Sequence, residues 1–275
     1  MDSTKLLAGK NGLIMGVANE KSIAYGIAEM AARFGANLHF SYQAEVLRKR
    51  VEPLAKSLGF ENNLIECNVA DEGAIERTFA ELAKRIPKLD FIVHSIGFSD
   101  KNELRGRYVD TSRANFLNTM DVSCYSLASI CKAAEKLMDG GGSVLTLTYY
   151  GSEKAIPNYN VMGVAKAALE ASVRYLANDL GPNNIRVNAI SAGAIRTLAA
   201  AGISDFRAML KAGERANPLK RNTTLEDVAG AAMFLLSDLG SGTTGEILHV
   251  DCGFHAVGMS IESDVAAEDK VCNSN

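Results

Sequence analysis

Two tyrosines and a lysine at fixed spacing are the residues of this chain best suited to chemistry. Tyr159 follows Tyr149 by ten residues, and Lys166 follows Tyr159 by seven. Because seven residues are close to two turns of an α-helix, the phenol of Tyr159 and the amine of Lys166 are expected on one helix face. A cation near a phenol biases the proton of that phenol. The spacing therefore predicts a site that can donate a proton.

Short β-rich segments alternate with helical patterns along the chain and must position these side chains. Parallel strands need crossovers as long as a helix, and such crossovers are right-handed, so the alternation predicts a doubly wound α/β sheet. A helix is expected from Ser22 to near Gly35, and a capping box from Thr224 to Asp227 predicts another. The expected strands are 12–17, 37–41, 64–69, 91–94, 143–148, 186–190 and 247–250.

The chain is expected to form a single domain over residues 1–260, followed by a frayed tail at 261–275. The segment 194–218 lies outside the β/α alternation and is compatible with a helix, and its small residues would allow it to move. We interpret it as a lid over a substrate, with an ordinary surface excursion as the alternative.

Composition excludes several classes of function. The 275 residues carry a net charge of −3, so the chain lacks the basic field that nucleic-acid binding needs. Its five cysteines form no CxxC pair, which argues for a reducing compartment. The amino terminus has no signal-like apolar core, and no segment approaches the roughly 20 apolar residues of a membrane span. The sequence thus predicts a cytoplasmic protein with no membrane partner.

A nucleotide site is expected where the first strand meets the first helix. Gly16 begins a flexible turn, and Ser22 and Ile23 open the helix, whose positive end can face a pyrophosphate. The Gly-x-Gly-x-x-Gly fingerprint is absent, and many such turns are purely structural. The position of the turn in the first βα unit favours the nucleotide interpretation.

Three residues at the ends of the second and third expected strands concern the adenosine half of a dinucleotide. Gln43 stands where many NAD-binding sheets carry an acidic residue for the ribose, and it can bind hydroxyls. Asn68 offers amide hydrogen bonds beside the adenine, and Val69 follows it, although both can equally belong to an ordinary strand end. We predict NADH rather than NADPH as the cofactor.

Several motifs resemble the short-chain dehydrogenase/reductase superfamily. They are Tyr159-x6-Lys166, the string HSIG from His94 and the string TGEILHVD from Thr244. Longer strings resemble bacterial NADH-dependent enoyl-(acyl carrier protein) reductases: SIAYGIA from Ser22, AIPNYNVMG from Ala155 and NAISAGAIRTL from Asn188. The resemblance covers nearly the whole chain and implies a Rossmann-type fold and a homotetramer, with the helices near 114–138 and 162–180 between subunits.

The same resemblance implies roles for Tyr149, Tyr159 and Lys166. Tyr159 would hydrogen-bond the thioester oxygen of an enoyl substrate, and Lys166 would bind the nicotinamide ribose and supply positive potential. Tyr149 would donate a proton, orient the substrate or only form the pocket wall, and these alternatives stay open. The hydride would come from NADH.

The resemblance also implies roles for further residues. Ser99 would lie near the substrate, and Arg207 and Lys211 on the lid are candidates for docking an acidic acyl carrier protein, with plain solvation as the alternative. No metal is expected. The residues that would line the cofactor are Gly16, Ser22, Ile23, Gln43, Asn68, Val69, Ile96, Lys166, Ile195, Arg196, Thr197, Leu198 and Ala199.

Some positions depart from the expected pattern. Thr146 occupies the place of the serine that binds a carbonyl in the broad superfamily, and Tyr149 is an extra tyrosine typical of the enoyl reductases. Asn68 stands where aspartate is common, and Cys252 replaces a glycine. Thr146 leaves open a ketoacyl or alcohol oxidoreductase, and a noncatalytic NAD-sensing module is a further alternative.

Overall fold

One parallel sheet organises the molecule, which a computed structural model describes over residues 5–198 and 206–258. Within these residues seven strands pair in the order β3-β2-β1-β4-β5-β6-β7, and all pairs are parallel. The predicted doubly wound α/β fold is therefore confirmed. The strands are β1 Asn11–Met15, β2 Asn37–Tyr42, β3 Leu64–Glu66, β4 Phe91–His94, β5 Gly142–Thr148, β6 Ile185–Ala192 and β7 Ile247–Val250.

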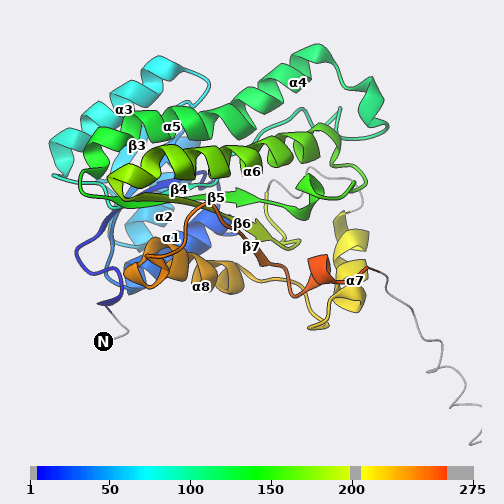
Figure 1. Ribbon diagram of the computed structural model, residues 1–275. Helices are drawn as coiled ribbons and strands as arrows, with labels where there is room; N and C mark the ends of the chain where they lie inside the picture. The colour runs from blue at the N-terminus through cyan, green and yellow to red at the C-terminus, as the bar shows by residue number, and fades with distance from the viewer. Residues whose placement is uncertain (1–4, 199–205, 259–275) are drawn as a thin grey trace, which may run out of the picture.

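Helices cover both faces of the sheet, and Figure 1 shows the two layers. The layer of α1 Ile23–Arg33, α2 Glu45–Ser57 and α8 Leu225–Leu236 packs on one face. The opposite layer contains α3 Glu72–Arg85, α5 Ser126–Ala134 and α6 Asn160–Leu180. Helix α4 Arg113–Met120 continues through a π-helical turn, Asp121–Tyr125, into α5.

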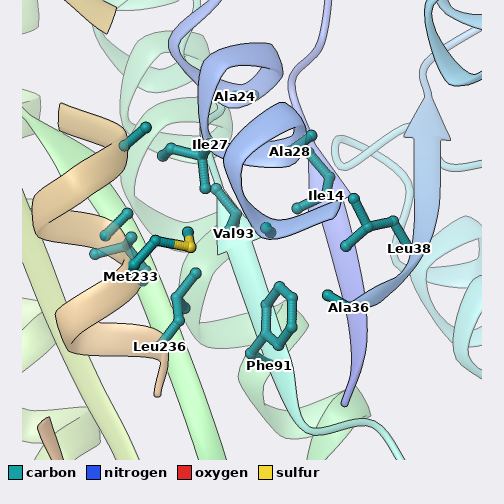
Figure 2. Close-up of a cluster of buried hydrophobic side chains, with 14 of the residues drawn as sticks. Ile14, Ala24, Ile27, Ala28, Ala36, Leu38, Phe91, Val93, Met233 and Leu236 are labelled. Atoms are coloured by element: carbon teal, nitrogen blue, oxygen red, sulfur yellow. The ribbon is translucent and has the colours of Figure 1, made fainter. Parts of the chain in front are cut away.

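The apolar core lies between the sheet and these layers. On the α1/α8 side, Ile14, Ile27, Phe91 and Met233 belong to one fully or nearly fully buried cluster, part of which Figure 2 shows. Strands covered on both faces must be apolar along their whole length, and β4 is buried at all four positions. This buried sheet fixes the carboxyl ends of its strands, where a ligand site is expected in folds of this kind.

The order of the strands reverses at β1, because β2 and β4 lie on its two sides. Crossovers run to opposite faces from such a point, and a crevice opens beyond the carboxyl ends of the two strands. Here the crevice lies beside Gly16 and Ser95, and the amide of Ser95 donates to the carbonyl of Met15 at 3.2 Å.

Strand boundaries differ slightly from those expected, and one difference concerns a candidate site. The third strand ends at Glu66 rather than at residue 69, so Asn68 and Val69 lie in the turn that follows it. The Oδ1 atom of Asn68 accepts a hydrogen bond from the amide of Ala70 at 3.3 Å, which forms an Asx-turn after the end of β3. The sixth strand extends past its expected end to Ala192.

Helix α7, Phe206–Ala216, falls within the segment interpreted as a lid and lies outside the two helical layers (Figure 1). Residues 199–205 and the expected tail at 261–275 lie outside the described residues. The single domain over 1–260 and the lid therefore stay predictions.

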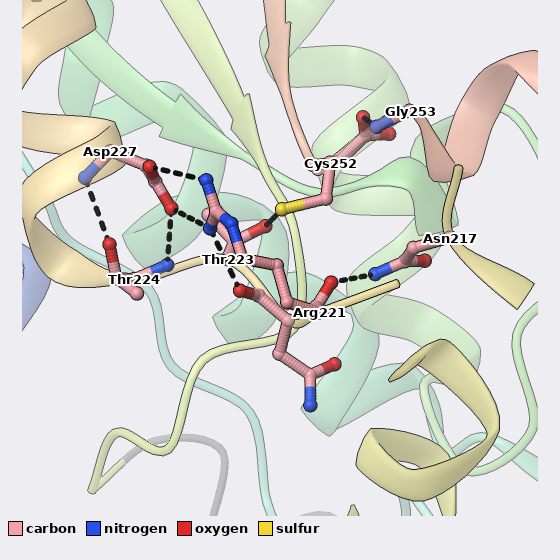
Figure 3. Close-up of polar contacts among 9 residues, drawn as sticks. Asn217, Arg221, Thr223, Thr224, Asp227, Cys252 and Gly253 are labelled. Carbon is pink, nitrogen blue, oxygen red and sulfur yellow. Dashed lines mark hydrogen bonds and ion pairs between the residues drawn. The ribbon is translucent and has the colours of Figure 1, made fainter. Parts of the chain in front are cut away.

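A polar cluster fixes the start of α8 after α7, as Figure 3 shows. Thr224 and Asp227 form the predicted capping box, and the guanidinium of Arg221 binds the Asp227 carboxylate in a bidentate manner. The hydrogen bond from Arg221, with a smaller contribution from the cap, lowers the pKa of Asp227 to about 2. The Thr223 hydroxyl contacts Sγ of Cys252 nearby at 3.7 Å.

Candidate active site

A cavity of about 340 Å³ opens at the carboxyl ends of β4, β5 and β6. Its wall is mostly apolar and contains Ile96, Ser99, Tyr149, Tyr159 and Lys166. These residues are far apart in the sequence but meet here because parallel strands end at one edge of the sheet. The remaining lining residues include Ile23, Phe98, Leu104, Leu147, Met162, Ala192, Gly193, Ala194, Ile195 and Thr197.

The Tyr159 and Lys166 side chains come from the first two turns of α6, as their spacing predicts. Tyr159 is the N-cap residue of this helix, and both residues are buried, with exposed fractions of 8% and 7%. The Nζ atom of Lys166 donates to the carbonyl of Leu147 on β5 at 2.8 Å. The phenol and the amine therefore line the same cavity.

Burial dominates the electrostatics of this pair. It raises the pKa of Tyr159, and the neighbouring Tyr149 and the charge of Glu170 add to the increase. Burial also lowers the pKa of Lys166 to about 8, against the opposing effects of Cys124 and Glu170. The phenol thus keeps its proton at neutral pH and is a donor, while the amine stays mostly cationic. The expected effect of the Lys166 cation on the phenol proton is not among the causes of this shift in the pKa of Tyr159.

A glycine makes room for the Tyr159 ring. A Cβ atom at Gly151 would lie 2.4 Å from Cδ1 of Tyr159, and one at Gly163 would lie 2.5 Å from the carbonyl oxygen of Gly151. The loop after β5 can therefore pack closely on α6 only because both positions lack a side chain. This close packing sets the position of the phenol.

Tyr149 follows the last residue of β5 and contacts the edge of the Tyr159 ring. The two ring centroids are 5.0 Å apart at an interplanar angle of 76°, a favourable edge-to-face geometry. Tyr149 also lines a second cavity of about 210 Å³ towards α7, as do Ala192, Gly193 and Ala194, so these four residues border both cavities. Burial raises its pKa, and it too is protonated at neutral pH.

The crevice at β1 has the features that a pyrophosphate needs. Gly16 has φ +93°, and a Cβ atom there would lie 1.9 Å from the carbonyl oxygen of Ser95, so only glycine fits. Ser22 is the N-cap residue of α1, yet its hydroxyl bonds back to the amides of Ala18 and Asn19 rather than capping the helix. The amino-terminal amides of α1 keep their capacity for an anion.

The residues expected around adenosine lie beyond this turn. Gln43, at the end of β2, donates from Nε2 to Oδ1 of Asn68 at 3.4 Å, and both side chains are neutral. Val69 is half-buried and packs against the core beside them. The structure thus brings the three residues together, although they do not line the cavity of Tyr159.

The segment after β6 is only partly turned towards the cavity. Ile195 and Thr197 line it, whereas Arg196 is exposed and Leu198 is 47% exposed. Ala199 and the side chain of Arg207 lie outside the described residues. Ser99 lines the cavity and bonds to Asn115 and Thr119 of α4, which orients its hydroxyl.

Several residues that line this cavity were not predicted, and Met162 and Leu147 are two of them. Met162 lines the cavity from the position between Tyr159 and Lys166 on one face of α6, and the same helical periodicity would have indicated it. Leu147 contributes a wall and the carbonyl that binds Lys166, and its role follows only from the sheet register. Among the residues that the structure describes, no cluster of three His, Cys, Asp or Glu side chains is arranged to hold a metal.

A doubly wound parallel sheet with a glycine turn at its reversal point and a buried Tyr–Lys pair defines a Rossmann-type oxidoreductase of the short-chain dehydrogenase/reductase class. Within this class, the chain belongs to the enoyl-(acyl carrier protein) reductase family, whose model matches residues 16–255.

Individual relatives agree with this assignment. The chain is 57% identical over 258 residues to the enoyl-(acyl carrier protein) reductase (NADH) of Rickettsia typhi, covering 94% of this chain and 98% of the relative. It is 51% identical over 255 residues to the enzyme of the same name from Escherichia coli K12, covering 92% and 97%. The crystal structure of the reductase from Anaplasma phagocytophilum in complex with NAD superposes with a TM-score of 0.90 at 58% identity, covering 93% and 97%.

A helix that crosses a bilayer needs about 20 predominantly apolar residues. In residues 5–198 and 206–258, no helix is both long enough and apolar enough to cross one.

Proposed function

We propose that the protein is an NADH-dependent enoyl-(acyl carrier protein) reductase, which reduces the double bond of a trans-2-enoyl thioester. One observation carries this assignment: the protonated phenols of Tyr149 and Tyr159 meet edge to face on the wall of an apolar cavity. Family membership and the relatives that are named for this activity support it.

The residues present fit a dinucleotide. Gly16 and the amino-terminal turn of α1, with Ser22 and Ile23, would hold the pyrophosphate, and Gln43 with Asn68 would bind the adenosine hydroxyls. Val69 would lie beside the adenine, and Lys166, Ile96 and residues 195–199 would line the nicotinamide end. The neutral Gln43 has no carboxylate for a ribose, but the relatives are named for NADH. NADH supplies the hydride when it is bound.

The electrostatic task of the protein is to stabilise the oxygen of the thioester. Reduction at the β carbon places negative charge on this oxygen, and a protonated hydroxyl that is positioned beside it stabilises that charge. Tyr159 supplies a protonated hydroxyl, because burial raises its pKa. The nearby cation of Lys166 adds positive potential at the same end of the cavity.

Tyr149 has no unique role in this scheme. Its hydroxyl can donate to the substrate, or its ring can hold the Tyr159 ring in place through the edge contact. Replacing Tyr149 with Phe keeps the ring and removes the hydroxyl. A loss of rate then assigns a polar role, and an unchanged rate assigns packing.

The substrate test uses two thioesters. NADH oxidation is followed with a crotonyl thioester and separately with an acetoacetyl thioester. Reduction of the first alone supports the enoyl reductase, and reduction of the second alone identifies a ketoreductase. Binding of NADH with neither reaction identifies an NAD sensor. Replacing Tyr159 with Phe should slow the crotonyl reaction while NADH binding persists, and an unchanged rate would contradict the role of Tyr159.

We further propose that α7 and the segment around it form a lid that receives the acyl carrier protein. Lys211 is exposed on α7, and Arg207 precedes it by four residues in the sequence, so we propose both as docking residues for an acidic carrier. Reversing both charges should raise KM for the carrier-linked substrate and leave KM for a coenzyme A thioester unchanged. Equal changes for both substrates would exclude this docking.

A homotetramer is the assembly that we propose. Leu117, Tyr125 and Tyr175 are large apolar or aromatic residues on α4, the π-helical turn and α6, and they are 54%, 51% and 75% exposed. An outer helical face of this kind suits contact with another subunit. Light scattering of the protein and of a Tyr175→Glu variant tests it, and a monomeric parent would exclude it.

The described cysteines are all free, in agreement with a cytoplasmic enzyme.

A further inference from the structure

Helix α6 carries a buried carboxylate for which the proposed function has no role. Glu170 is only 8% exposed and lies four residues after Lys166, on the same face of the helix. A buried carboxylate is costly unless hydrogen bonds and opposite charge compensate it. The surroundings of Glu170 therefore indicate what it stabilises.

One partner of Glu170 is the last residue of β5. The hydroxyl of Thr148 donates to Oε1 of Glu170 at 2.6 Å, a length typical of a hydrogen bond to an ionised carboxylate. The preceding residue, Leu147, accepts the hydrogen bond from Nζ of Lys166 at 2.8 Å. Glu170 and Lys166 thus bind two consecutive residues of the strand, and Tyr149 follows directly.

Glu170 also interacts with Lys166 and Tyr159 through its charge. Three titratable groups interact electrostatically with the Lys166 amine: His94 of β4, Cys124 of the π-helical turn and Glu170 of α6. Tyr149 and Tyr159 line the same cavity as the amine. Glu170 is the carboxylate of this group. It raises the pKa of Lys166, which burial lowers, and it raises the pKa of Tyr159, which burial raises as well. Its charge therefore favours the protonated form of both residues.

We propose that Glu170 is a positioning residue for the reduction, which fixes the end of β5 through Thr148 and keeps the Lys166 amine cationic through its charge. The proposal rests on the proposed function for its kinetic part. It assigns two separable contributions to one side chain: the hydrogen bond orients Leu147 and Tyr149, and the charge acts on Lys166.

Two variants separate the contributions. Glu170→Gln keeps the size and can still accept from Thr148, but it removes the charge. Thr148→Val removes the hydroxyl and leaves the charge in place. We expect Glu170→Gln to move the alkaline limb of kcat/KM, and of NADH binding followed by fluorescence, to lower pH by about one unit. Thr148→Val should lower kcat several-fold and leave the limb at its original pH.

The outcomes are decisive in both directions. An alkaline limb of Glu170→Gln that coincides with that of the parent would overturn the proposal, as would an equal shift in Thr148→Val. Glu170→Leu is the second variant without charge. If neither it nor Glu170→Gln folds by circular dichroism, Glu170 serves stability alone and the proposal fails. Because NADH binding is measured without substrate, a parent protein that reduces no enoyl thioester would disprove the proposed function and still leave the charge effect testable.

Discussion

The hydroxyl oxygen of Thr146 lies 2.9 Å from Nδ1 of His94, within the protein interior and not at the cavity of Tyr159. It also donates to the carbonyl of His94 at 3.1 Å, and Nε2 of His94 lies 2.9 Å from the hydroxyl of Ser126. Burial and the charge of Lys166 lower the pKa of His94 to about 3, so the ring is neutral. A neutral imidazole donates from one ring nitrogen, so one of the two hydroxyls accepts a hydrogen bond from it.

This arrangement predicts the effect of removing the Thr146 hydroxyl. Thr146→Val should lower the free energy of unfolding by about 1–3 kcal/mol, because a buried ring nitrogen loses its partner. Reduction of a crotonyl thioester should stay within about twofold of the parent, since the hydroxyl does not reach the substrate. Urea unfolding and steady-state rates measure the two effects. Thr146→Ser keeps the hydroxyl and is the control, and a loss of rate without a loss of stability would contradict the assignment.

A second prediction concerns the glycine beside the Tyr159 ring. Gly151→Ala places a methyl group 2.4 Å from Cδ1 of that ring, so the phenol must move. We expect kcat for the enoyl reaction to fall by about tenfold or more, because a small misplacement of a catalytic group is costly. The Kd for NADH should change little. Gly181→Ala is the matched control, since nothing lies within 4 Å of the added carbon, and equal losses in both variants would refute the role of Gly151.

A third prediction concerns acid stability. His39 is 2% exposed, and neither ring nitrogen has a partner among the described residues. Burial, with a smaller effect of Arg85, lowers its pKa from 6.5 to about 4. The unfolded chain binds the His39 proton more tightly than the folded protein does. The folded protein is therefore fully stable with respect to His39 above pH 6.5, and it loses stability as the pH falls towards 4. Protonation of His39 should therefore make the free energy of unfolding about 2 kcal/mol lower at pH 5 than at pH 7.5.

Urea unfolding at several pH values measures this loss. His39→Leu should flatten the dependence by that amount and leave the part that His94 contributes, because the pKa of His94 is lowered as well. Equal pH slopes for the variant and the parent would show that His39 finds a partner in the folded protein.

The fourth prediction concerns Cys252, a buried residue at φ +57° in place of a glycine. A left-handed backbone strains any residue with a Cβ atom. Cys252→Ala keeps this strain, whereas Cys252→Gly removes it, so the Gly variant should be more stable than the Ala variant by about 1 kcal/mol. At Ser241, where φ is −56°, the order should be the reverse. Thermal unfolding of the four variants compares them, and the same order at both positions would argue against strain.

Local patterns were enough to predict much of the fold and part of the site. The spacing of Tyr159 and Lys166 is a helical period, and it does not depend on distant parts of the chain. The capping box at Thr224 is local in the same way. The ends of β4 and β7 followed from apolar runs that are bounded by turn residues.

Features that depend on distant residues could not be predicted. The early end of β3 depends on its pairing with β2, and only Phe40 to Tyr42 contribute partners. The raised pKa of Tyr159 depends on burial by elements far along the chain. The sequence does predict that the side chains of Thr146 and Thr148 point to the same face of β5, because side chains alternate along a strand. That face packs on α5 and α6, which only the complete topology reveals.

The position of Tyr149 between two cavities has a consequence for substrate range. One cavity holds the Lys166 amine and the other reaches α7, and the ring borders both. Together with Ala192, Gly193 and Ala194, Tyr149 lines both the cavity of about 340 Å³ and the cavity of about 210 Å³. We expect an acyl chain too long for the first cavity to pass these shared residues, so the size of the side chain at position 149 should influence which chain lengths are accepted.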